Sequence, residues 1–414
     1  MADFNYHLPD ELIARFPPAV RGASRLLVLP PGGGGQGGQE GPPPLDRHFR
    51  DLGDHLPEGA HLVLNHSKVF AARTFGREVG GGGGGGGGGE AVEVMFLNPE
   101  RPHADPARAL AAPCRGQVWR AMVRRVAGPR ARAPWTCPLQ AAAAAGGGGA
   151  GGAGGGEGAV EVEIVHPGMG CARLFAAFGE VPLPPYFRRP TAAADRETYQ
   201  TVYASAGAEG SVAAPTAGLH FTPEVLEDLG ARGFRTGRLS LHVGSGTFRP
   251  VVAERVAEHG MHAEPGGGGG GARGTTAVRT LESLYWLGAQ RSWGAPRGGA
   301  EGGEGGGAAA AGAVEAYRWA VGARRAAVAL RAAAELAQEG GGAAAVRGTT
   351  ALCAAPGYRF RLADALVTNF HQPDSTLLLL AAALVGGPGR LRAAYAHAVH
   401  GRYRFLSYGD ACLL

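Results

Sequence analysis

Three closely spaced segments between residues 213 and 264 organise the whole chain. They are Ala213-Ala-Pro-Thr-Ala-Gly-Leu-His-Phe-Thr222, Leu239-Ser-Leu-His-Val-Gly-Ser-Gly-Thr-Phe-Arg-Pro250 and His259-Gly-Met-His-Ala-Glu264. Small residues let a backbone approach a ligand closely, and histidine beside a carboxylate suits proton transfer. Residues 239–243 predict a buried strand and residues 244–247 its exit turn. The segments therefore predict a site built from turns at strand ends.

The composition indicates a soluble protein with long insertions. The chain has 414 residues, a hydrophobic fraction of 45% and 73 glycines, many of them in unbroken runs. Such runs cannot bury a core and predict flexible surface insertions, at 265–273, 294–312 and 339–347 among others. The net charge of +5 permits a nucleic-acid partner without requiring one.

The cysteines and the hydropathy pattern predict where the protein works. The 5 cysteines have no paired spacing, which favours a reducing compartment over a disulfide framework. No apolar run is long enough to cross a membrane, and nothing at the N-terminus resembles a targeting peptide. We expect a cytoplasmic protein with no membrane segment, and a plastid location stays open.

Outward from these segments, buried strands alternate with helices, which is typical of an α/β fold. Strands are predicted at 25–29, 60–65 and 366–369, and helices at 4–15, 48–56, 195–203, 222–232, 314–338 and 391–399. A last strand is predicted at 402–408. The strand at 60–65 delivers Asn65, Ser67 and Lys68 to a strand end, where α/β proteins often bind ligands. The alternative is a turn with an exposed lysine.

Residues 73–166 have a different pattern. Short β-rich pieces at 91–97, 118–126 and 159–165 alternate with Gly, Ala and Pro loops. This predicts a small all-β domain, residues 73–166, inserted into an α/β catalytic domain made of residues 1–72 and 167–414.

Several polar residues suit chemistry, each with a plainer alternative. His220 lies in a turn that can hold a flat ring against Phe221, or it is a surface histidine. His259, His262 and Glu264 suit a metal by residue type but match no zinc spacing. Asn369 and His371 form a proton-transfer pair or cap a helix. Two adjacent arginines, Arg188 and Arg189, suit RNA phosphates or are simply solvated.

The same segments resemble the S-adenosylmethionine:tRNA ribosyltransferase-isomerases of queuosine biosynthesis. The resemblance continues at Val181-Pro-Leu-Pro-Pro-Tyr186, Tyr199-Gln-Thr-Val-Tyr203, Gly274-Thr-Thr-Ala-Val-Arg279, Thr368-Asn-Phe-His-Gln-Pro-Asp-Ser-Thr376 and Tyr403-Arg-Phe-Leu-Ser-Tyr-Gly-Asp410. These motifs are long, stand in the family's order and cover most of the chain outside the glycine runs.

The resemblance implies a reaction and a fold. The family transfers the ribosyl group of S-adenosylmethionine to the aminomethyl-deazaguanine base (preQ1) at the wobble position of tRNA and isomerises it, giving epoxyqueuosine, adenine and methionine. It implies a barrel-like α/β domain with an inserted β-barrel, no metal and no cofactor beyond S-adenosylmethionine as the ribosyl donor. The expected partner is a tRNA whose anticodon carries preQ1, and the expected oligomeric state is a monomer.

The resemblance also suggests roles for individual residues. Proton transfer is assigned to a catalytic group of His242, His262, Glu264 and His371. The substrate-binding group comprises Thr216, Gly218, His220, Phe221, Gly244, Gly246, Thr247, Arg279 and Asn369. In it, His220 and Phe221 would lie against the adenine or the base, and Arg279 would bind the methionine carboxylate. RNA binding is assigned to Arg188 and Arg189.

One region departs from the family pattern. A glycine run follows Glu264 where the family has a strand and a helix, and a second Gly-Thr-Thr stands at 348–350, far from the first at 274–276. The site is therefore assembled from both copies, or the order is scrambled. Two other functions stay open: an RNA-binding homologue that has lost turnover, and a metal-dependent hydrolase built on His259, His262 and Glu264.

Overall fold

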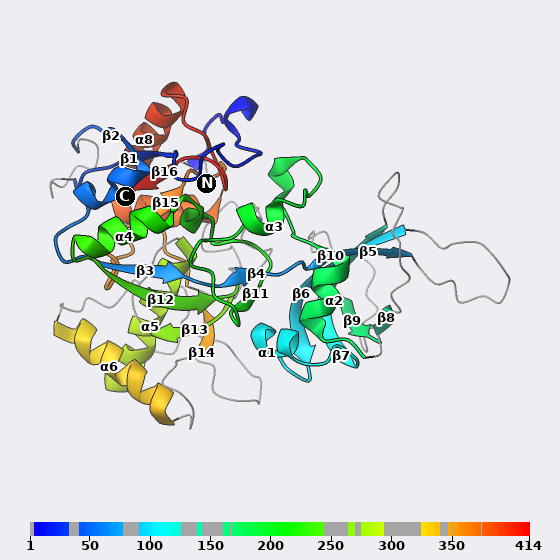
Figure 1. The fold of residues 1–414 in the computed structure, drawn as a ribbon. Coiled ribbons are helices and arrows are strands. Elements are labelled where there is room, and N and C mark those ends of the chain that lie inside the picture. Colours follow the sequence, from blue (N-terminus) through cyan, green and yellow to red (C-terminus); the bar gives the residue numbers. More distant parts are fainter. Residues whose placement is uncertain are drawn as a thin grey trace, which may run out of the picture.

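Strands from both ends of the chain pair in one sheet. In the computed structural model, which describes residues 4–32, 41–77, 91–125, 139–142, 160–165, 168–243, 264–269, 275–293, 324–339, 347–350, 352–373 and 375–414, this sheet has the order β15-β16-β1-β2. The strands are β1 (Arg25–Val28), β2 (Leu45–His48), β15 (Val367–Asn369) and β16 (Ala411–Leu413). The sheet places both termini in the same half of the molecule (Figure 1).

A second sheet carries the strand ends at which the sequence predicts a site. Its order is β14-β13-β12-β3, with β3 (His61–Asn65), β12 (Arg235–Leu241), β13 (Glu264–Gly269) and β14 (Arg347–Thr350). Strands β3 and β12 are parallel, with Asn65 opposite Leu239, so both end at one edge. A short parallel pair, β4 (Lys68–Val69) and β11 (Glu209–Ser211), continues beyond that edge.

The glycine run after Glu264 is a strand over residues 264–269, so the prediction of a loop insertion there was wrong. Backbone groups pair β13 antiparallel to β12 on one side and to β14 on the other. A strand held by two neighbours needs few contacts from its own side chains, although glycine weakens it.

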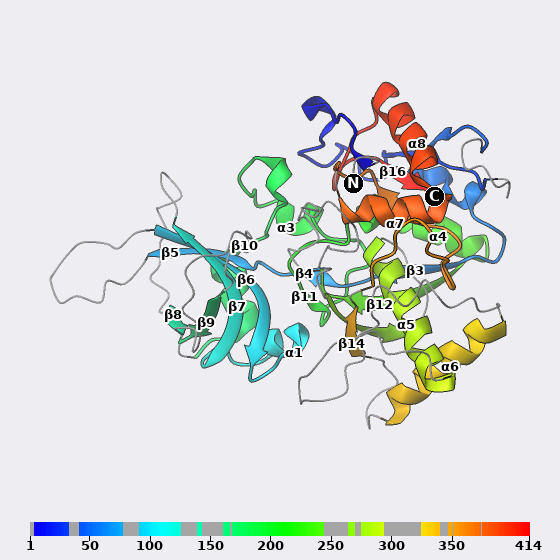
Figure 2. The same cartoon turned by 180° about the vertical axis from the view of Figure 1, so that it is seen from behind.

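Six antiparallel strands form a separate module beside these sheets (Figures 1 and 2). Their order is β10-β5-β6-β7-β9-β8, with β5 (Arg73–Arg77), β6 (Ala91–Arg101), β7 (Gln117–Arg125), β8 (Leu139–Ala142), β9 (Val160–Ile164) and β10 (Gly179–Glu180). The predicted β-rich pieces correspond to β6, β7 and β9.

Aromatic side chains form the core of this module. Trp119, Phe96 and Phe175 have ring centroids 4.9 to 6.1 Å apart, and Phe70 joins them. Two short helices, α1 (Pro106–Ala111) and α2 (Cys171–Phe178), cover the core. Helix α2 and strand β10 therefore pack with the six-stranded sheet, although both lie beyond residue 166.

Helices surround the sheets of the other half. They are α3 (Asp195–Thr198), α4 (Pro223–Ala231), α5 (Thr275–Trp293), α6 (Arg324–Glu339), α7 (Thr376–Val385) and α8 (Pro388–His400). Helix α4 begins as predicted, with Thr222 Oγ1 accepting a hydrogen bond from the amide of Val225 at 3.3 Å. It ends as predicted, because Gly233 adopts φ +83°, which favours glycine. Four 3₁₀ segments complete the described helical elements: η2 (Asp10–Leu12), η3 (Phe49–His55), η5 (Pro185–Phe187) and η6 (Thr216–His220).

Two predictions near the termini were wrong. Residues 4–15 contain the short 3₁₀ turn η2 and no α-helix, and Ile13 bridges to Phe405. Residues 402–408 are a loop, since Arg402 and Leu406 have φ of 53° and 70°. The Asp410 carboxylate fixes this loop by accepting from the amides of Arg404 and Arg25, each at 2.8 Å. The last strand is β16 instead.

Among the described helices, none is by itself long and apolar enough to cross a membrane. Helices α7 and α8 reach that length and apolarity only as a pair, and they bend by 108° where they meet.

Candidate functional site

His220, at the end of η6, lies at the centre of a buried hydrogen-bond chain. Its Nε2 is 2.9 Å from Asn369 Nδ2, and its Nδ1 is 3.1 Å from Ser24 Oγ. Asn369 Nδ2 also donates to the Leu406 carbonyl at 3.1 Å, and a flipped amide would point its oxygen at that carbonyl. The amide nitrogen therefore faces His220, so Nε2 accepts and Nδ1 donates to Ser24.

Burial keeps this imidazole neutral. The His220 side chain is 3% exposed, and desolvation lowers its pKa to about 3, helped by the nearby cations of Arg21 and Arg404. Desolvation disfavours the charged form of a histidine. At neutral pH His220 therefore passes on a hydrogen bond but carries no charge.

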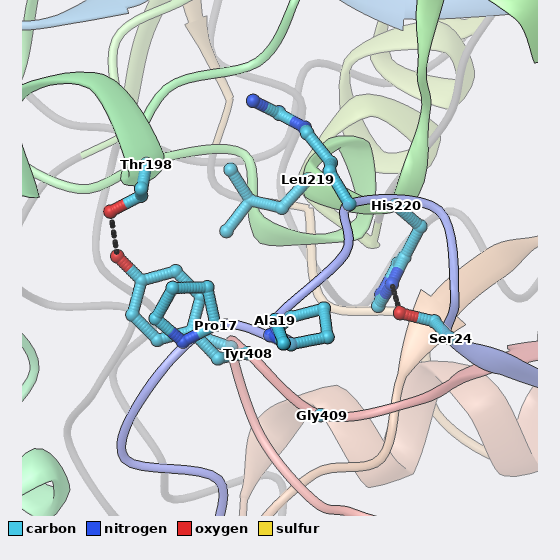
Figure 3. A pocket seen from close by; sticks show the side chains of 11 residues that line it. Pro17, Ala19, Ser24, Thr198, Leu219, His220, Tyr408 and Gly409 are labelled. Carbon is cyan, nitrogen blue, oxygen red and sulfur yellow. Dashed lines mark hydrogen bonds between the residues drawn. The ribbon is translucent and has the colours of Figure 1, made fainter.

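A cavity of about 180 Å³ opens beside this chain. It is lined by Pro17, Pro18, Ala19, Arg21, Ser24, Thr198, Leu219, His220, Ser407, Tyr408 and Gly409. Figure 3 shows the His220–Ser24 pair on one side of it and the Thr198–Tyr408 pair on another, with Leu219 between them. The two hydroxyls of Thr198 and Tyr408 are 3.2 Å apart. Most of the wall is apolar, and a few polar groups converge on it, as in binding sites for small molecules.

The turn that carries His220 needs glycine at position 218. A Cβ there would lie 2.1 Å from the Tyr203 hydroxyl and 2.7 Å from Thr201 Cγ2, closer than any side chain tolerates. Phe221 turns the other way, into the core, where its ring meets Phe49 edge-on at 4.8 Å. Of the predicted residues on this turn, His220 alone lines the cavity, whereas Thr216, Gly218 and Phe221 do not.

A second polar cluster lies at the ends of β3 and β12. Asn65 Oδ1 accepts from the amides of Ser67 and Leu241, each at 3.1 Å. Ser211 Oγ donates to Ser67 Oγ at 2.8 Å and accepts from the Val243 amide at 3.1 Å. These bonds fix the backbone on either side of His242. The Lys68 ammonium pairs with Glu209 at 3.0 Å.

Two histidines of this cluster have buried ring nitrogens without a partner. His66 and His242 each follow the last residue of one of the parallel strands. The Nδ1 atoms of both are buried with no hydrogen-bond partner in the described part of the chain, while His66 Nε2 lies 2.7 Å from Ser240 Oγ. An unpaired buried polar atom is costly and therefore suggests a role beyond folding.

Electrostatics favours the neutral form of His242. Desolvation lowers its pKa, nearby Asp105 raises it and His66 lowers it, with a net decrease. The pKa of His66 is lowered by burial and by Arg238. A neutral imidazole with an unpaired nitrogen can accept a proton. His66 was not among the predicted site residues, although its position directly after a buried strand is a signal the sequence contains.

His371 lies in a different environment from its neighbour Asn369. Its Nε2 is 2.8 Å from Thr368 Oγ1, its amide donates to the Tyr395 hydroxyl at 3.1 Å, and Tyr6 donates to its carbonyl. Desolvation lowers its pKa to about 3. The structure therefore does not pair Asn369 with His371.

Arg279 joins the two Gly-Thr-Thr segments. It lies on α5, is 3% exposed, and donates from Nε to the Leu352 carbonyl at 2.9 Å and from one terminal nitrogen to the Thr350 carbonyl at 3.2 Å. Ser283 Oγ lies 2.7 Å from Thr350 Oγ1. These bonds join the two segments that the sequence separates.

The two predicted RNA-binding arginines have different environments. Arg189 forms two 2.7 Å bonds with the Asp195 carboxylate and donates from Nε to the Arg15 carbonyl at 2.8 Å. Its side chain is only 10% exposed. Arg188 is exposed and pairs with Asp10 at 3.0 Å. Arg189 thus holds the fold together, and Arg188 is the one on the surface.

Several predicted residues lie outside the described residues. These are Gly244, Gly246, Thr247, His259 and His262. Glu264 is described by its backbone, which pairs with Thr350 in the sheet. Within the described ranges no group of three His, Cys, Asp or Glu side chains could hold a metal, which leaves the alternative on His259, His262 and Glu264 untested.

Sequence reasoning missed Ser24, Arg21 and Thr198 in the cavity wall. No motif marks Ser24 or Arg21, which lie before an ordinary buried strand. The signal for Tyr408 was present, because it belongs to the C-terminal motif at residues 403–410, but the motif alone assigns it no role.

A family model and the similar proteins of known name agree on the family of this chain. The family model of queuosine biosynthesis proteins matches residues 1–300 and 308–414. The chain is 39% identical to an S-adenosylmethionine:tRNA ribosyltransferase-isomerase from Anaeromyxobacter sp. and 37% identical to one from Azoarcus sp., covering 100% of this chain and 98% and 97% of those proteins.

A solved structure matches this chain over nearly its whole length. The crystal structure of S-adenosylmethionine tRNA ribosyltransferase from Thermotoga maritima is 24% identical, with 99% of each chain covered and a TM-score of 0.38. At that TM-score the likeness supports no structural argument.

Proposed function

The chain belongs to the family of queuosine biosynthesis proteins, and we propose that it acts as an S-adenosylmethionine:tRNA ribosyltransferase-isomerase. The observation that carries this proposal is the match along the whole chain to relatives with that name. A shared fold alone would not suffice, because one fold supports many functions. Here the chemistry-bearing residues lie in the matched part.

We propose the finer substrate from the motifs. The acceptor would be preQ1 at the wobble position of tRNA, and the products epoxyqueuosine, adenine and methionine. Such a reaction needs a base for a proton next to the sulfonium and a neutral amine to attack. Neutral, partly desolvated imidazoles suit the first demand.

His242 is the described residue that we propose as the base. Its Nδ1 is buried and has no partner in the described part of the chain, its pKa is lowered, and it lies at the end of a parallel strand. His262 and Glu264 remain proposed members of the same group. His371 is a weaker candidate, because Thr368 and Tyr395 occupy its ring nitrogen and its amide.

The methionine end and the tRNA complete the proposal. Arg279 would bind the methionine carboxylate, together with the turn at 244–247. Its guanidinium already donates to the Thr350 and Leu352 carbonyls, so these bonds would orient it. Arg188, exposed on the loop after η5, would contact an RNA phosphate.

We also propose that the two halves are an inserted domain and a catalytic domain. The six-stranded sheet, closed as a β-barrel, would be the inserted domain, and the barrel-like α/β remainder the catalytic one. The aromatic core of the six-stranded module supports this division and includes α2. Because β10 also pairs with β5, we propose the second boundary after Glu180 instead of after residue 166. The pKa of His242 is lowered mainly by burial, and the carboxylate of Asp105 at the start of α1 offsets part of that decrease, so the module reaches the strand-end cluster.

The alternative of a homologue without turnover rests on the rearranged region. The bonds from Arg279 and Ser283 to Thr350 favour the enzyme, since they reunite the separated segments. Adenine release from S-adenosylmethionine in the presence of preQ1-containing tRNA distinguishes the two. Turnover that survives a chelator dismisses the metal-dependent hydrolase.

Replacement of His242 tests the assignment of the base. We expect His242→Gln to lower kcat by 100-fold or more, on the order of what general base catalysis contributes, with S-adenosylmethionine binding retained. The matched control is His400→Gln, at the exposed end of α8, with unchanged kcat. Near-normal turnover by His242→Gln would dismiss the assignment, whereas no turnover by the wild type would dismiss the proposed function.

A further inference from the structure

The cavity beside His220 has the hydrogen-bond polarity of a site for one kind of ring. We propose that it binds the adenine ring of S-adenosylmethionine, with the Ser24 hydroxyl donating a hydrogen bond to a ring nitrogen. The inference rests on the proposed function for the identity of the substrate. It deepens that function by choosing between the adenine and the deazaguanine base.

The direction of the hydrogen-bond chain makes Ser24 a donor. Asn369 donates to His220 Nε2, and His220 Nδ1 therefore donates to Ser24 Oγ. With its oxygen accepting that bond, and with no other partner for the hydroxyl among the described residues, Ser24 has its own hydrogen left for a ligand. Ser24 is 4% exposed and lines the cavity, so that hydrogen can serve a ligand there.

The charged residue of the cavity wall, Arg21, is a hydrogen-bond donor like Ser24. Arg21 lines the cavity and donates from one terminal nitrogen to the Gln200 carbonyl at 2.7 Å. Its charge is one reason why the pKa of His220 is low. A guanidinium only donates, and its positive charge disfavours the sulfonium or the preQ1 amine at this place. The cavity therefore suits a neutral ring with acceptor atoms.

The edges of the two candidate rings differ in what they require. Adenine presents acceptor nitrogens and a single exocyclic amine. A guanine-like edge presents a ring N–H and an amine side by side, which a carboxylate usually meets. Among the described residues that line the cavity there is none. The nearby Asp195 accepts from Arg189 and from the Ala192 amide. A deazaguanine would leave its donors unpaired, which is costly.

Size and shape agree with a ring rather than a whole nucleoside. The volume of about 180 Å³ is below the roughly 300–1,000 Å³ of sites for drug-sized ligands. Pro17, Pro18 and Leu219 supply apolar surface for the ring faces. The rest of the substrate would extend out of the cavity.

A scan of ring nitrogens tests the inference. Adenine and its 1-, 3- and 7-deaza analogues are titrated against the full chain by calorimetry, with competition by S-adenosylmethionine. We expect the wild type to bind adenine, and to bind one of the deaza analogues about 10-fold more weakly, which is the usual contribution of one hydrogen bond to affinity. Ser24→Ala should bind adenine about 10-fold more weakly and should no longer discriminate against that analogue. Ser24→Thr keeps a hydroxyl and should still discriminate against it.

The control and the contrary outcomes separate this inference from the proposed function. Ser205→Ala removes a half-buried hydroxyl outside the cavity and should leave the scan unchanged. The inference is overturned if all deaza analogues lose the same affinity relative to adenine, in the wild type and in Ser24→Ala alike. Tighter binding of 7-deazaguanine than of adenine also overturns it. Adenine binding needs no turnover, so a wild type that binds adenine as expected but releases none from S-adenosylmethionine contradicts the proposed function alone.

Discussion

Two buried histidines bond to neutral partners and therefore couple folding to pH. Burial lowers the pKa of both His220 and His371 to about 3. In the unfolded chain each would titrate near its ordinary value of 6.5. Between about pH 3 and 6.5 the unfolded state therefore binds more protons, and stability falls as the pH falls.

The prediction is a loss of about 2 kcal/mol for each histidine between pH 6.5 and pH 5, at about 1.4 kcal/mol per pH unit. We expect His371→Gln to be less stable at pH 7 but to have a shallower pH dependence by that amount. Urea unfolding of wild type and variant at pH 7, 6 and 5 measures it. Parallel pH dependences for the two proteins would show that His371 is not buried as a neutral group.

At this scale the sequence predicts the positions of His220 and Asn369, because both belong to turn motifs next to strands. It places Asn369 and His220 in motifs, but it cannot tell that Asn369 faces His220 while His371 faces Thr368. Residues two apart on a strand would share a face, but β15 ends at Asn369. His371 therefore lies beyond the strand, and its surroundings come from remote parts of the chain. Ser24 has no local signal at all.

At the level of elements, α5 and α6 meet through a glycine. A Cβ on Gly288 would lie 1.8 Å from the Ala329 carbonyl oxygen and 2.5 Å from its carbon. Both atoms are backbone, so neither can move without shifting a helix. The close approach of the two helices therefore depends on the missing side chain.

We predict that Gly288→Ala destabilises the protein by about 1–3 kcal/mol, the usual cost of overpacking, despite the better helix propensity of alanine. The matched control is Gly230→Ala on α4, which meets nothing within 4 Å and should gain up to about 1 kcal/mol. Urea unfolding compares them. An equal increase in the free energy of unfolding for both variants would mean that α5 and α6 do not pack this closely.

Element predictions failed where partners rather than local sequence decide. The glycine run at 264–269 has the composition of a loop, yet β12 and β14 supply its hydrogen bonds. Residues 4–15 have helical spacing, yet Ile13 pairs with Phe405. Where the local signals were complete, as with the Thr222 cap and Gly233 stop of α4, the prediction was confirmed.

Over the whole molecule, buried contacts join segments that are far apart in sequence. Arg279 reunites two segments about 70 residues apart, which no local pattern reveals. The Arg189–Asp195 pair likewise connects three regions of the chain: residues 189–195 and segments near the two termini. Arg189 holds the Arg15 carbonyl near the N-terminus, and Asp195 accepts from Tyr408 near the C-terminus at 3.3 Å.

The charges of this pair are well compensated. Burial would raise the pKa of Asp195, but hydrogen bonds from Arg189 and the Ala192 amide hold it below its ordinary value. The carboxylate therefore contributes stability at neutral pH, and that contribution is lost as the pH falls below 3.8 through the folded-state pKa. This window lies below that of the buried histidines, so the two effects are measured separately.

We predict that Asp195→Ala costs about 3–5 kcal/mol at pH 7, because it leaves the guanidinium of Arg189 buried and unpaired. The matched control is Asp10→Ala. Asp10 pairs with two arginines, Arg188 and Arg15, but all three side chains are at least 36% exposed, so its removal should cost at most about 1 kcal/mol. Urea unfolding at pH 7 compares the two. If both variants lose the same small amount, Arg189 is solvated, the three regions are not tied together by this pair, and Arg189 regains its place beside Arg188 as a candidate for RNA binding.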